Sequence, residues 1–403
     1  MSSQTVPRHR DLGYQLVDAD NHYYEPYDAF TRFIEPDFAE RVINVKVDEK
    51  GRGKLYFGER QFRFMRVTQT DYIGAPGSMR KMLDDPDSKQ GFVHDEIIRG
   101  WDYPDMMQRV ARIAKMDELG VQSGLMLGTM MLQAENELYD DIPALYANIR
   151  SYNRWLDDEW GFDRDGRILT AAMISLMDPE LAITELDRLI SAGVRAVVMK
   201  PGPLWGRSPV EPVYDGFWSR LQDADVKLVF HSTDPRYIAI LGEQFGESTT
   251  PSMQGQTPFQ WYLISGKPVA DTLASYILNN LFGRFPGLTI VALECGINWI
   301  VPLLHDIDHA AHMGRKGHWP GGEVKGRPSE VLMQHLYVSP FYEEDVVGLV
   351  RSIGPERVLM GSDYPHPEGV ADPIEWLERL EGLSDREIRM IMRDNAAGLL
   401  GIK

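Results

Sequence analysis

Asp18, Asp20 and His22 stand at every second position of the stretch "LVDADNHYYEP", residues 16–26. The side chains of a β-strand alternate between its two faces, so these three would project from one face of an extended segment. Two carboxylates beside an imidazole suit a divalent metal such as Zn²⁺ or Mn²⁺. A solvated strand end has the same composition, and only other parts of the chain can separate the two interpretations.

Residues of similar chemistry follow four later apolar runs. They are Lys200 after "AVVM", His231 after "KLVF", Glu294 after "IVAL", and Asp363 with His366 after "VLMGS". In an α/β barrel the active site lies at the carboxyl ends of the strands, which would bring these side chains together. Imidazoles and carboxylates with an open position predict a site where a metal lowers the pKa of bound water or polarises a substrate oxygen.

The elements that must position these residues alternate regularly. Apolar runs predict eight strands, at 15–20, 121–127, 168–176, 194–200, 226–232, 288–294, 335–339 and 357–363. Helical spacing predicts helices at 104–120, 138–160, 178–193, 213–224, 268–285, 299–312 and 343–353. Strands that are apolar on both faces and separated by helices predict a parallel sheet. Eight such units favour an α/β fold of the (β/α)₈ TIM-barrel type, although periodicity does not exclude an open doubly wound sheet.

Residues 37–100 interrupt this alternation after the first strand. The segment 41–67 alternates apolar and polar residues around a glycine-containing turn, which predicts a β-hairpin, and 74–91 resembles a loop. We therefore expect one domain over 1–403, with 37–100 as a lid-like insertion. The long loops 201–212, 232–266 and 313–330 would help to select the substrate. A terminal helix is predicted from the Ser384 cap to Gly401.

Composition narrows the class of protein. The chain of 403 residues is 43% hydrophobic and has 42 Lys and Arg against 60 Asp and Glu, a net charge of −18. Without a basic block, nucleic acid and anionic membranes are not expected as partners. The single Cys295 excludes an intramolecular disulfide and a cysteine metal cluster, and fits a reducing cytosol. The N-terminal 15 residues have no apolar signal segment, so a cytoplasmic protein is expected.

Several segments together resemble the amidohydrolase superfamily, in the branch of aminocarboxymuconate-semialdehyde decarboxylase and related hydrolases. They are "VDADNHYYEP", "RIAKMDELGVQSGLM", "VFHS", "ECGINWIVPLL", "MGSDYPHPEG" and "NAAGLLGI", in that order over residues 15–402. The resemblance implies a barrel enzyme with one divalent metal and no organic cofactor. Relatives often form dimers, so it also implies a homo-oligomer that acts on a small molecule.

The resemblance assigns the metal to Asp20, His22, His231 and Asp363. In that family the first-strand motif is D-x-H-x-H, and Asp20 stands where a histidine is usual. We expect zinc, with manganese as the alternative because a carboxylate is a harder ligand. Glu294 replaces a histidine that activates the metal-bound water, and would serve as that base or merely bond a neighbour. His366 would donate to substrate or orient Asp363, and we count Glu294, Asp363 and His366 as catalytic.

Three further residues are candidates for substrate binding. Lys200 stands where two-metal relatives have a carboxylated, bridging lysine, but contact with a substrate carboxylate is the preferred role. Asn298 and Trp299 would line the pocket or cap and pack a helix. On the helix over 299–312, the histidines 305, 309 and 312 share one face and are interpreted as solvated or subunit-facing, not as a metal site.

The resemblance supports two reactions on a small cyclic or aromatic organic acid. In hydrolysis, which we favour here, a metal-activated water attacks a polarised carbonyl. In the alternative, a non-oxidative decarboxylation of an aromatic or muconate-type acid, the metal binds the carboxylate and a neighbouring hydroxyl, and an acid protonates the carbon. A catalytically inactive barrel that acts as a binding module is the second alternative.

Overall fold

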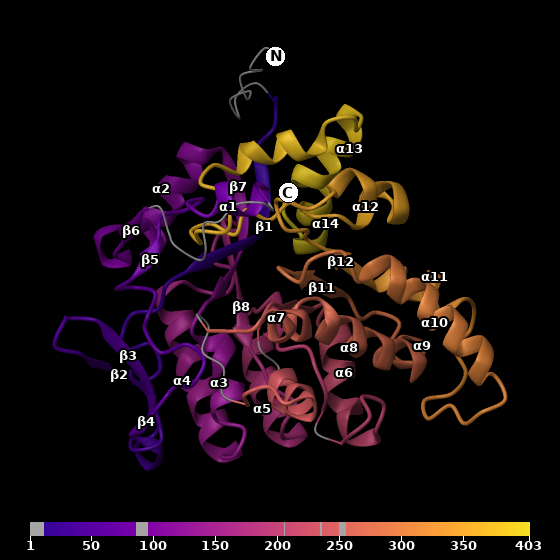
Figure 1. Cartoon of the computed structure of the whole chain (residues 1–403), viewed down its shortest axis with the longest axis horizontal. Coiled ribbons are helices and arrows are strands. Elements are labelled where there is room, and N and C mark those ends of the chain that lie inside the picture. The colour runs from indigo at the N-terminus through magenta and orange to yellow at the C-terminus, as the bar shows by residue number, and fades with distance from the viewer. Residues whose placement is uncertain (1–11, 86–95, 205, 234–235, 250–254) are drawn as a thin grey trace.

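The computed structural model describes residues 12–85, 96–204, 206–233, 236–249 and 255–403. At its centre a curled, seven-stranded parallel sheet is surrounded by helices (Figure 1). In spatial order its strands are β1 (Leu16–Tyr23), β7 (Val121–Gly128), β8 (Ile168–Met173), β9 (Ala196–Met199), β10 (Lys227–His231), β11 (Ile290–Leu293) and β12 (Leu336–Val338). All neighbouring pairs are parallel, so the predicted α/β fold with a parallel sheet is confirmed.

Apart from β1, which has the polar residues Asp18, Asp20, Asn21 and His22, these strands are mainly apolar because both of their faces are covered. Every residue of β1, β8, β9, β10 and β11 is buried. A parallel sheet covered on both sides selects uninterrupted aliphatic runs, because each side chain points into packed protein whichever face it is on. The polar residues at the ends of such runs therefore need a separate explanation.

The eighth predicted strand, 357–363, is not a regular strand, although its backbone contacts both edges of the sheet. Val358 bridges Val338 of β12, and Tyr364 bridges Asn21 of β1, both in parallel. Gly361 packs tightly against Asp20 of β1 and Ser339 just after β12: a Cβ there would lie 2.5 Å from the Cβ of Asp20 and from Ser339 Oγ.

The helices that cover the sheet follow the predicted order. They are α2 (Arg109–Leu119), α4 (Ile142–Glu159), α5 (Pro179–Ser191), α6 (Asp215–Asp223), α8 (Lys267–Leu278), α10 (Ile300–Gly314) and α12 (Val346–Ile353). Shorter helices are α3 (Ala134–Glu137), α7 (Pro258–Ile264), α9 (Leu281–Arg284), α11 (Pro328–His335), α13 (Asp385–Arg389) and α14 (Asn395–Leu400). The single helix predicted over 268–285 is wrong: Asn280 adopts a left-handed conformation (φ 59°) and separates α8 from α9. α7 likewise lies in a segment predicted as a loop.

The C-terminal prediction is confirmed in detail. Ser384 caps α13 in a capping box with Glu387, one turn of π-helix joins α13 to α14, and Gly401 ends α14 in the left-handed conformation (φ 71°). A 3₁₀ helix, Pro373–Leu380, precedes this terminal segment. No described helix is both long and apolar enough to cross a membrane.

The insertion after β1 contains the predicted hairpin. β2 (Ile43–Val47) pairs with β3 (Gly53–Phe57), and β4 (Arg60–Gln61) extends this antiparallel sheet. β5 (Ile73–Gly74) and β6 (Ile97–Ile98) form a second small pair. The segment predicted as a loop contains the short helix α1 (Arg80–Asp84), and its part from 86 to 91 lies outside the described residues.

A cluster that we call the latch joins α1 to the 3₁₀ helix near the C-terminus. The ring of Tyr342 lies between the guanidinium groups of Arg80 and Arg379, each 4.3 Å from its centroid. Arg80 of α1 pairs with Glu375, and Arg379 pairs in the opposite direction with Asp84 of α1. The insertion is therefore held against the main body of the fold by reciprocal ion pairs around one aromatic ring.

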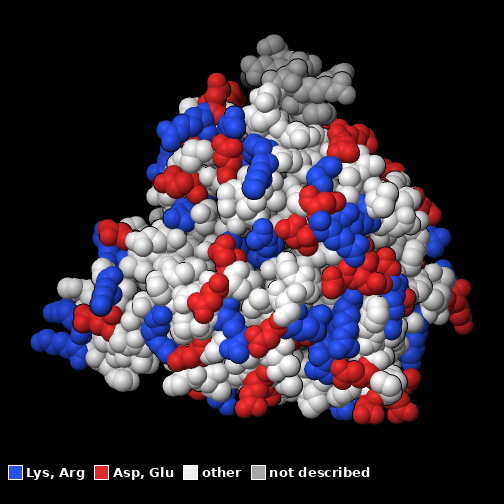
Figure 2. All heavy atoms as spheres, turned by 180° about the vertical axis from the view of Figure 1, so that it is seen from behind, with Lys and Arg blue, Asp and Glu red and all other residues white. Residues whose placement is uncertain are grey.

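Charged side chains of both signs are interspersed on the face of the molecule in Figure 2. This distribution agrees with the absence of a basic block in the sequence. The expectation that nucleic acid is not a partner stays a prediction.

We predict that Arg379→Ala opens α1 locally without unfolding the protein. Exposed ion pairs stabilise by about 0–1 kcal/mol and exposed cation–π contacts by about 0.5–1 kcal/mol, so global stability should fall by roughly 2 kcal/mol at most. Hydrogen exchange measured by mass spectrometry should become faster in peptides that cover 79–85. Arg389→Ala, which removes another half-exposed arginine paired with Asp394, is the matched control. Equal exchange rates at 79–85 in the two variants would contradict the latch.

Candidate metal centre and its cavity

Asp20 and His22 lie on β1, where the strand is irregular. The register against β7 shifts between Asp18 and Asn21. Asp20 and His22 line a cavity, but Asp18 does not. The carboxylate of Asp18 instead accepts hydrogen bonds from the Asn21 side chain at 2.9 Å and from Ser362 N at 2.9 Å, and burial raises its pKa to about 6. The prediction that all three residues share one functional face is therefore wrong for Asp18.

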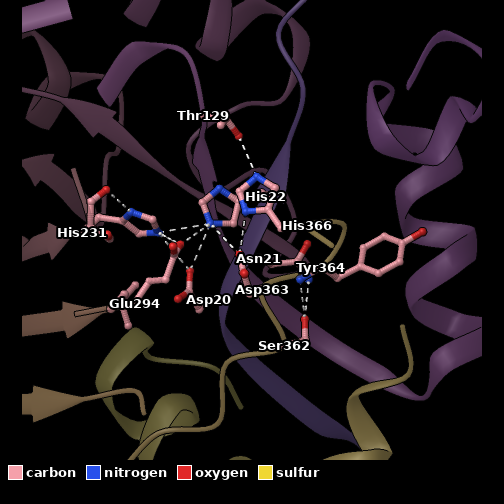
Figure 3. Close-up of polar contacts among 12 residues, drawn as sticks. Asp20, Asn21, His22, Thr129, His231, Glu294, Ser362, Asp363, Tyr364 and His366 are labelled. Atoms are coloured by element: carbon pink, nitrogen blue, oxygen red, sulfur yellow. Dashed lines mark hydrogen bonds and ion pairs between the residues drawn. The ribbon is translucent and has the colours of Figure 1, made fainter. Parts of the chain in front are cut away.

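Two imidazoles and one carboxylate meet at the centre of the site (Figure 3). Nε2 of His22 lies 3.2 Å from Nε2 of His231, which comes from the end of β10. Asp20 Oδ1 lies 3.4 Å from the first of these atoms and 3.7 Å from the second. The three side chains thus present one potential ligand atom each toward a common point.

Glu294, just after β11, and Asp363, in the irregular segment after β12, complete this cluster. Glu294 Oε2 lies 3.1 Å from His231 Nε2, and Asp363 Oδ1 lies 3.3 Å from His22 Nε2. Both residues adopt the left-handed backbone conformation, with φ of 48° for Glu294 and 56° for Asp363. This conformation is unfavourable for residues with a Cβ, and it is found where the surrounding structure imposes it at functional sites.

His366 extends the cluster through hydrogen bonds on both of its ring nitrogens. Nδ1 lies 2.7 Å from Asp363 Oδ1, and Nε2 lies 3.0 Å from Thr129 Oγ1. The ring also stacks on that of His22, with centroids 4.1 Å apart. A hydrogen bond of this length between a ring nitrogen and a carboxylate oxygen requires one proton between them, so His366 and Asp363 together hold a proton at the edge of the cluster.

Thr129 and Glu25 are parts of the site that sequence reasoning missed. Thr129 follows β7, where a hydroxyl after the run "LMLG" is the only signal. Glu25 is buried, and its Oε1 accepts hydrogen bonds from the backbone of Met130 at 2.9 Å and of Met131 at 3.2 Å. Burial raises the pKa of Glu25 to about 7. Glu25 therefore positions the segment that contains Thr129, so that the Thr129 hydroxyl contacts His366.

The charges in the cluster act strongly on one another. Burial, with a smaller effect of His366, lowers the pKa of His22 to about 4. Burial also disfavours the charged form of His231, but the facing Glu294 outweighs it and raises the pKa of His231 well above its usual value. Burial opposes ionisation of Asp20 as well, yet the two imidazoles hold its pKa below the usual range. The carboxylates thus favour positive charge at His231, in the middle of the cluster.

The donor set fits a divalent cation. Asp20 Oδ1 is buried and accepts no hydrogen bond from any described residue. Nδ1 of His231 lies 3.2 Å from the carbonyl oxygen of Ser232, and a proton donated there leaves the Nε2 lone pair directed into the cluster. The candidate ligand atoms of Asp20, His22 and His231 all lie within 4.8 Å of one another, and so do those of His22, Glu294, Asp363 and His366. These residues form a buried metal site.

The cluster opens into a cavity of about 500 Å³. Five of the residues that line it come from the insertion: Phe64, Met65, Gln69, Met79 and Leu83. Backbone hydrogen bonds from Gly77 to His366 and from Met79 to Pro367 attach this part of the insertion to the loop after residue 363. The walls are mainly apolar, so a small organic molecule with an apolar body would be shielded from water there.

The three predicted substrate-binding residues do not line this cavity. Lys200 contacts Glu135, with Nζ 3.0 Å from Oε1, beside a separate and much smaller pocket. Asn298 is exposed. Trp299 donates to the carbonyl oxygens of residues 295 and 296 and packs behind Gly266, where a Cβ would lie 2.3 Å from its ring. The histidines at 305, 309 and 312 are exposed on α10, consistent with a solvated interpretation.

Comparisons with known proteins agree with the resemblance noted in the sequence. Residues 17–402 match the family model described as Amidohydrolase. The solved structure of the amidohydrolase map2389c from Mycobacterium avium subsp. paratuberculosis K-10 is 35% identical, with 96% of this chain and 99% of that chain covered and a TM-score of 0.87.

Two further similar proteins are decarboxylases. Decarboxylase orsB of Emericella nidulans is 25% identical over 246 residues, which cover 59% of this chain and 70% of orsB. The fold is shared with 5-carboxyvanillate decarboxylase of Novosphingobium aromaticivorans DSM 12444, at 16% identity, 100% coverage of both chains and a TM-score of 0.62. That structure is a complex with manganese and 4-hydroxy-3-methoxy-5-nitrobenzoic acid.

We predict that the protein binds about one Mn²⁺ or Zn²⁺ per chain and loses it in His231→Ala. Removal of a ligand should weaken binding by more than the 10–100-fold that loss of a ligand's hydrogen-bond partner costs. At 100 times its dissociation constant the metal should stabilise the fold by about 2.7 kcal/mol. Elemental mass spectrometry and titration calorimetry measure this, with His305→Ala, at an exposed histidine, as the control. Metal loss in both variants would contradict the assignment.

We also predict that Glu294→Gly is more stable than Glu294→Ala in chelator-treated protein. Both variants lack the carboxylate, but only alanine keeps the penalty for a Cβ at a φ of 48°. That penalty is roughly 1–2 kcal/mol, and the extra freedom of unfolded glycine reduces the difference to about 1 kcal/mol. Denaturant unfolding provides the measurement. Asn298, whose φ is not positive, is the control position, where the alanine variant should be more stable than the glycine variant. If the glycine variant were the more stable one at both positions, the argument for strain at Glu294 would fail.

Proposed function

We propose that the chain, which belongs to the amidohydrolase family, is a metal-dependent, non-oxidative decarboxylase of an aromatic acid that carries a hydroxyl next to its carboxylate. The observation that carries this proposal is the hydrogen bond of 2.7 Å between His366 Nδ1 and Asp363 Oδ1, at the junction of the metal cluster and an apolar cavity. Decarboxylation needs an acid at this place, since carbon must receive a proton when CO₂ leaves.

The names of two similar proteins support placing decarboxylation ahead of hydrolysis. Decarboxylase orsB and 5-carboxyvanillate decarboxylase are both named as enzymes that remove a carboxyl group. Hydrolysis, which we favoured from the sequence, becomes the second candidate and is supported by the name amidohydrolase of the 35% identical structure. Its base would be Glu294, whose Oε2 lies 3.1 Å from His231 Nε2 and is thus engaged with another member of the cluster.

Manganese is the metal that we propose. Carboxylates of Asp20, Glu294 and Asp363 stand beside only two or three imidazoles, and hard oxygen ligands suit Mn²⁺ better than a histidine-rich site would. The manganese bound by the related decarboxylase supports the same choice over zinc. When bound, the ion supplies positive charge that orients an anionic substrate and stabilises negative charge on its oxygens.

The residues of this chain hold the proton and exclude water. In our mechanism the bond between the ring carbon and the carboxylate breaks, its electron pair stays on the ring carbon, and the proton shared by Asp363 and His366 moves to that carbon. CO₂ and the decarboxylated ring are the products. Thr129 Oγ1, 3.0 Å from His366 Nε2, would pass a replacement proton to the pair. The apolar insertion residues over the cavity keep bulk water from the reacting carbon.

The architecture around this site is part of the proposal. We propose that the segment 358–364 acts as the eighth strand of a (β/α)₈ barrel, since it bridges both β1 and β12. One domain with 37–100 as a lid fits the insertion residues in the cavity wall. The homodimer stays a prediction. An inactive binding module is disfavoured because every residue of the cluster has a side chain that can bind metal or transfer a proton.

We predict that Mn²⁺-loaded protein releases CO₂ from hydroxybenzoic acids without consuming O₂. In D₂O the product should carry one deuterium on the carbon that lost the carboxylate, as nuclear magnetic resonance can measure. Asp363→Asn, compared with the wild type at equal manganese content, should lower kcat by about 10²–10⁴-fold, the usual contribution of general acid–base catalysis. Asp223→Asn, at an exposed aspartate of α6, is the matched control. Turnover of esters or amides with no CO₂ from any acid would favour the hydrolytic alternative.

A further inference from the structure

Two carboxylates line the cavity without belonging to the metal cluster. Glu343 follows β12, and Glu368 lies in the loop after Asp363. Neither is among the residues whose ligand atoms group together. No hydrogen bond from another described residue reaches either carboxylate. They therefore face the cavity with acceptor oxygens that the described part of the protein leaves available.

Outside the metal cluster, the described wall of the cavity offers no positive side chain to balance them. Its described wall contains five carboxylates and no lysine or arginine. Arg80 and Arg379 lie on the ring of the wall residue Tyr342, but they pair with Glu375 and Asp84 of the latch. A cation bound by the metal cluster would then be the main attraction that the described residues offer to an anionic substrate group. A second carboxylate on the substrate would meet like charge, which is unfavourable in a partly buried site.

We propose that Glu343 and Glu368 determine specificity by accepting hydrogen bonds from a hydroxyl or amino group on the substrate ring and by repelling a second carboxylate. The inference rests on the proposed function, because it takes the metal as the place where the first carboxylate binds. The substrate class is thus an aromatic monocarboxylic acid with a hydrogen-bond donor on the part of the ring away from the carboxylate. Muconate-type dicarboxylates, which the sequence left open, are outside this class.

The test compares the binding of defined acids to Mn²⁺-loaded full-length protein by titration calorimetry. The probes are 2-hydroxybenzoate, its 4- and 5-hydroxy and 4- and 5-amino derivatives, and 4-hydroxybenzene-1,3-dicarboxylate. We expect at least one hydroxy or amino derivative to bind about 10-fold or more tightly than 2-hydroxybenzoate, as a hydrogen bond to a charged acceptor allows. The dicarboxylate should bind at least about 10-fold more weakly.

Substitutions at Glu343 and Glu368 test whether these two side chains cause the differences in affinity among the probes. In the double variant Glu343→Gln with Glu368→Gln, the dicarboxylate should approach the affinity of 2-hydroxybenzoate, and the advantage of the added donor should shrink. Glu381→Gln, at an exposed glutamate after the 3₁₀ helix, is the matched control and should behave as the wild type. Manganese stoichiometry in each variant verifies that the site is intact.

The outcomes separate this inference from the proposed function. Equal binding of mono- and dicarboxylates by the wild type, no measurable binding of any probe, or unchanged ratios in the double variant would each overturn the specificity role. The expected binding pattern without CO₂ release from any probe would support the specificity role and refute decarboxylation. The wild-type comparison holds even if the double variant does not fold.

Discussion

The site depends on one electrostatic constraint: the carboxylates of Asp20, Glu294 and Asp363 are gathered around the imidazoles of His22 and His231. Asp20, Glu294 and Asp363 each come within 3.7 Å of an imidazole nitrogen. Ligand atoms of Glu294 and Asp363 also lie within 4.8 Å of each other, and buried carboxylates this close repel, while the imidazoles compensate only part of their charge. A divalent cation resolves this conflict, because it attracts every ligand atom at once. The arrangement is understandable only as a binding site for positive charge.

Local irregularities of the fold follow from this constraint. Glu294 and Asp363 stand in left-handed conformations, the register of β1 shifts beside Asp20, and the segment before Asp363 pairs through isolated bridges. Each departs from ideal strand geometry near a ligand-type side chain. The extensive burial of the neighbouring strands supplies the stability that offsets such strain. The curled sheet positions the ligand-type side chains where its strands depart from regular geometry.

Sequence reasoning found the parts of this structure that leave a local pattern. Strands buried on both faces show as aliphatic runs, so His231 and Glu294 were recognisable as polar residues at strand ends. Thr129 and Glu25 were missed because their roles depend on partners 237 and 105 residues away, which no local period records. Lys200 looked equivalent to the other strand-end residues, but its Nζ reaches Glu135 and not the cavity. Side-chain direction at a strand end is a tertiary property.

The residues of the insertion that line the cavity could not be predicted from the local sequence pattern either. Its pattern predicted a hairpin, yet the residues that line the cavity, such as Phe64 and Met79, lie outside the paired strands β2 and β3. They reach the site because the backbone of Gly77 and Met79 bonds to the loop at His366 and Pro367, and because the latch holds α1 on the far side. The apolar wall over the substrate and the loop that carries the proton-holding His366 are thus joined directly. A substrate that fills the cavity contacts both at once, so recognition of its ring and placement of the proton are properties of one packed unit.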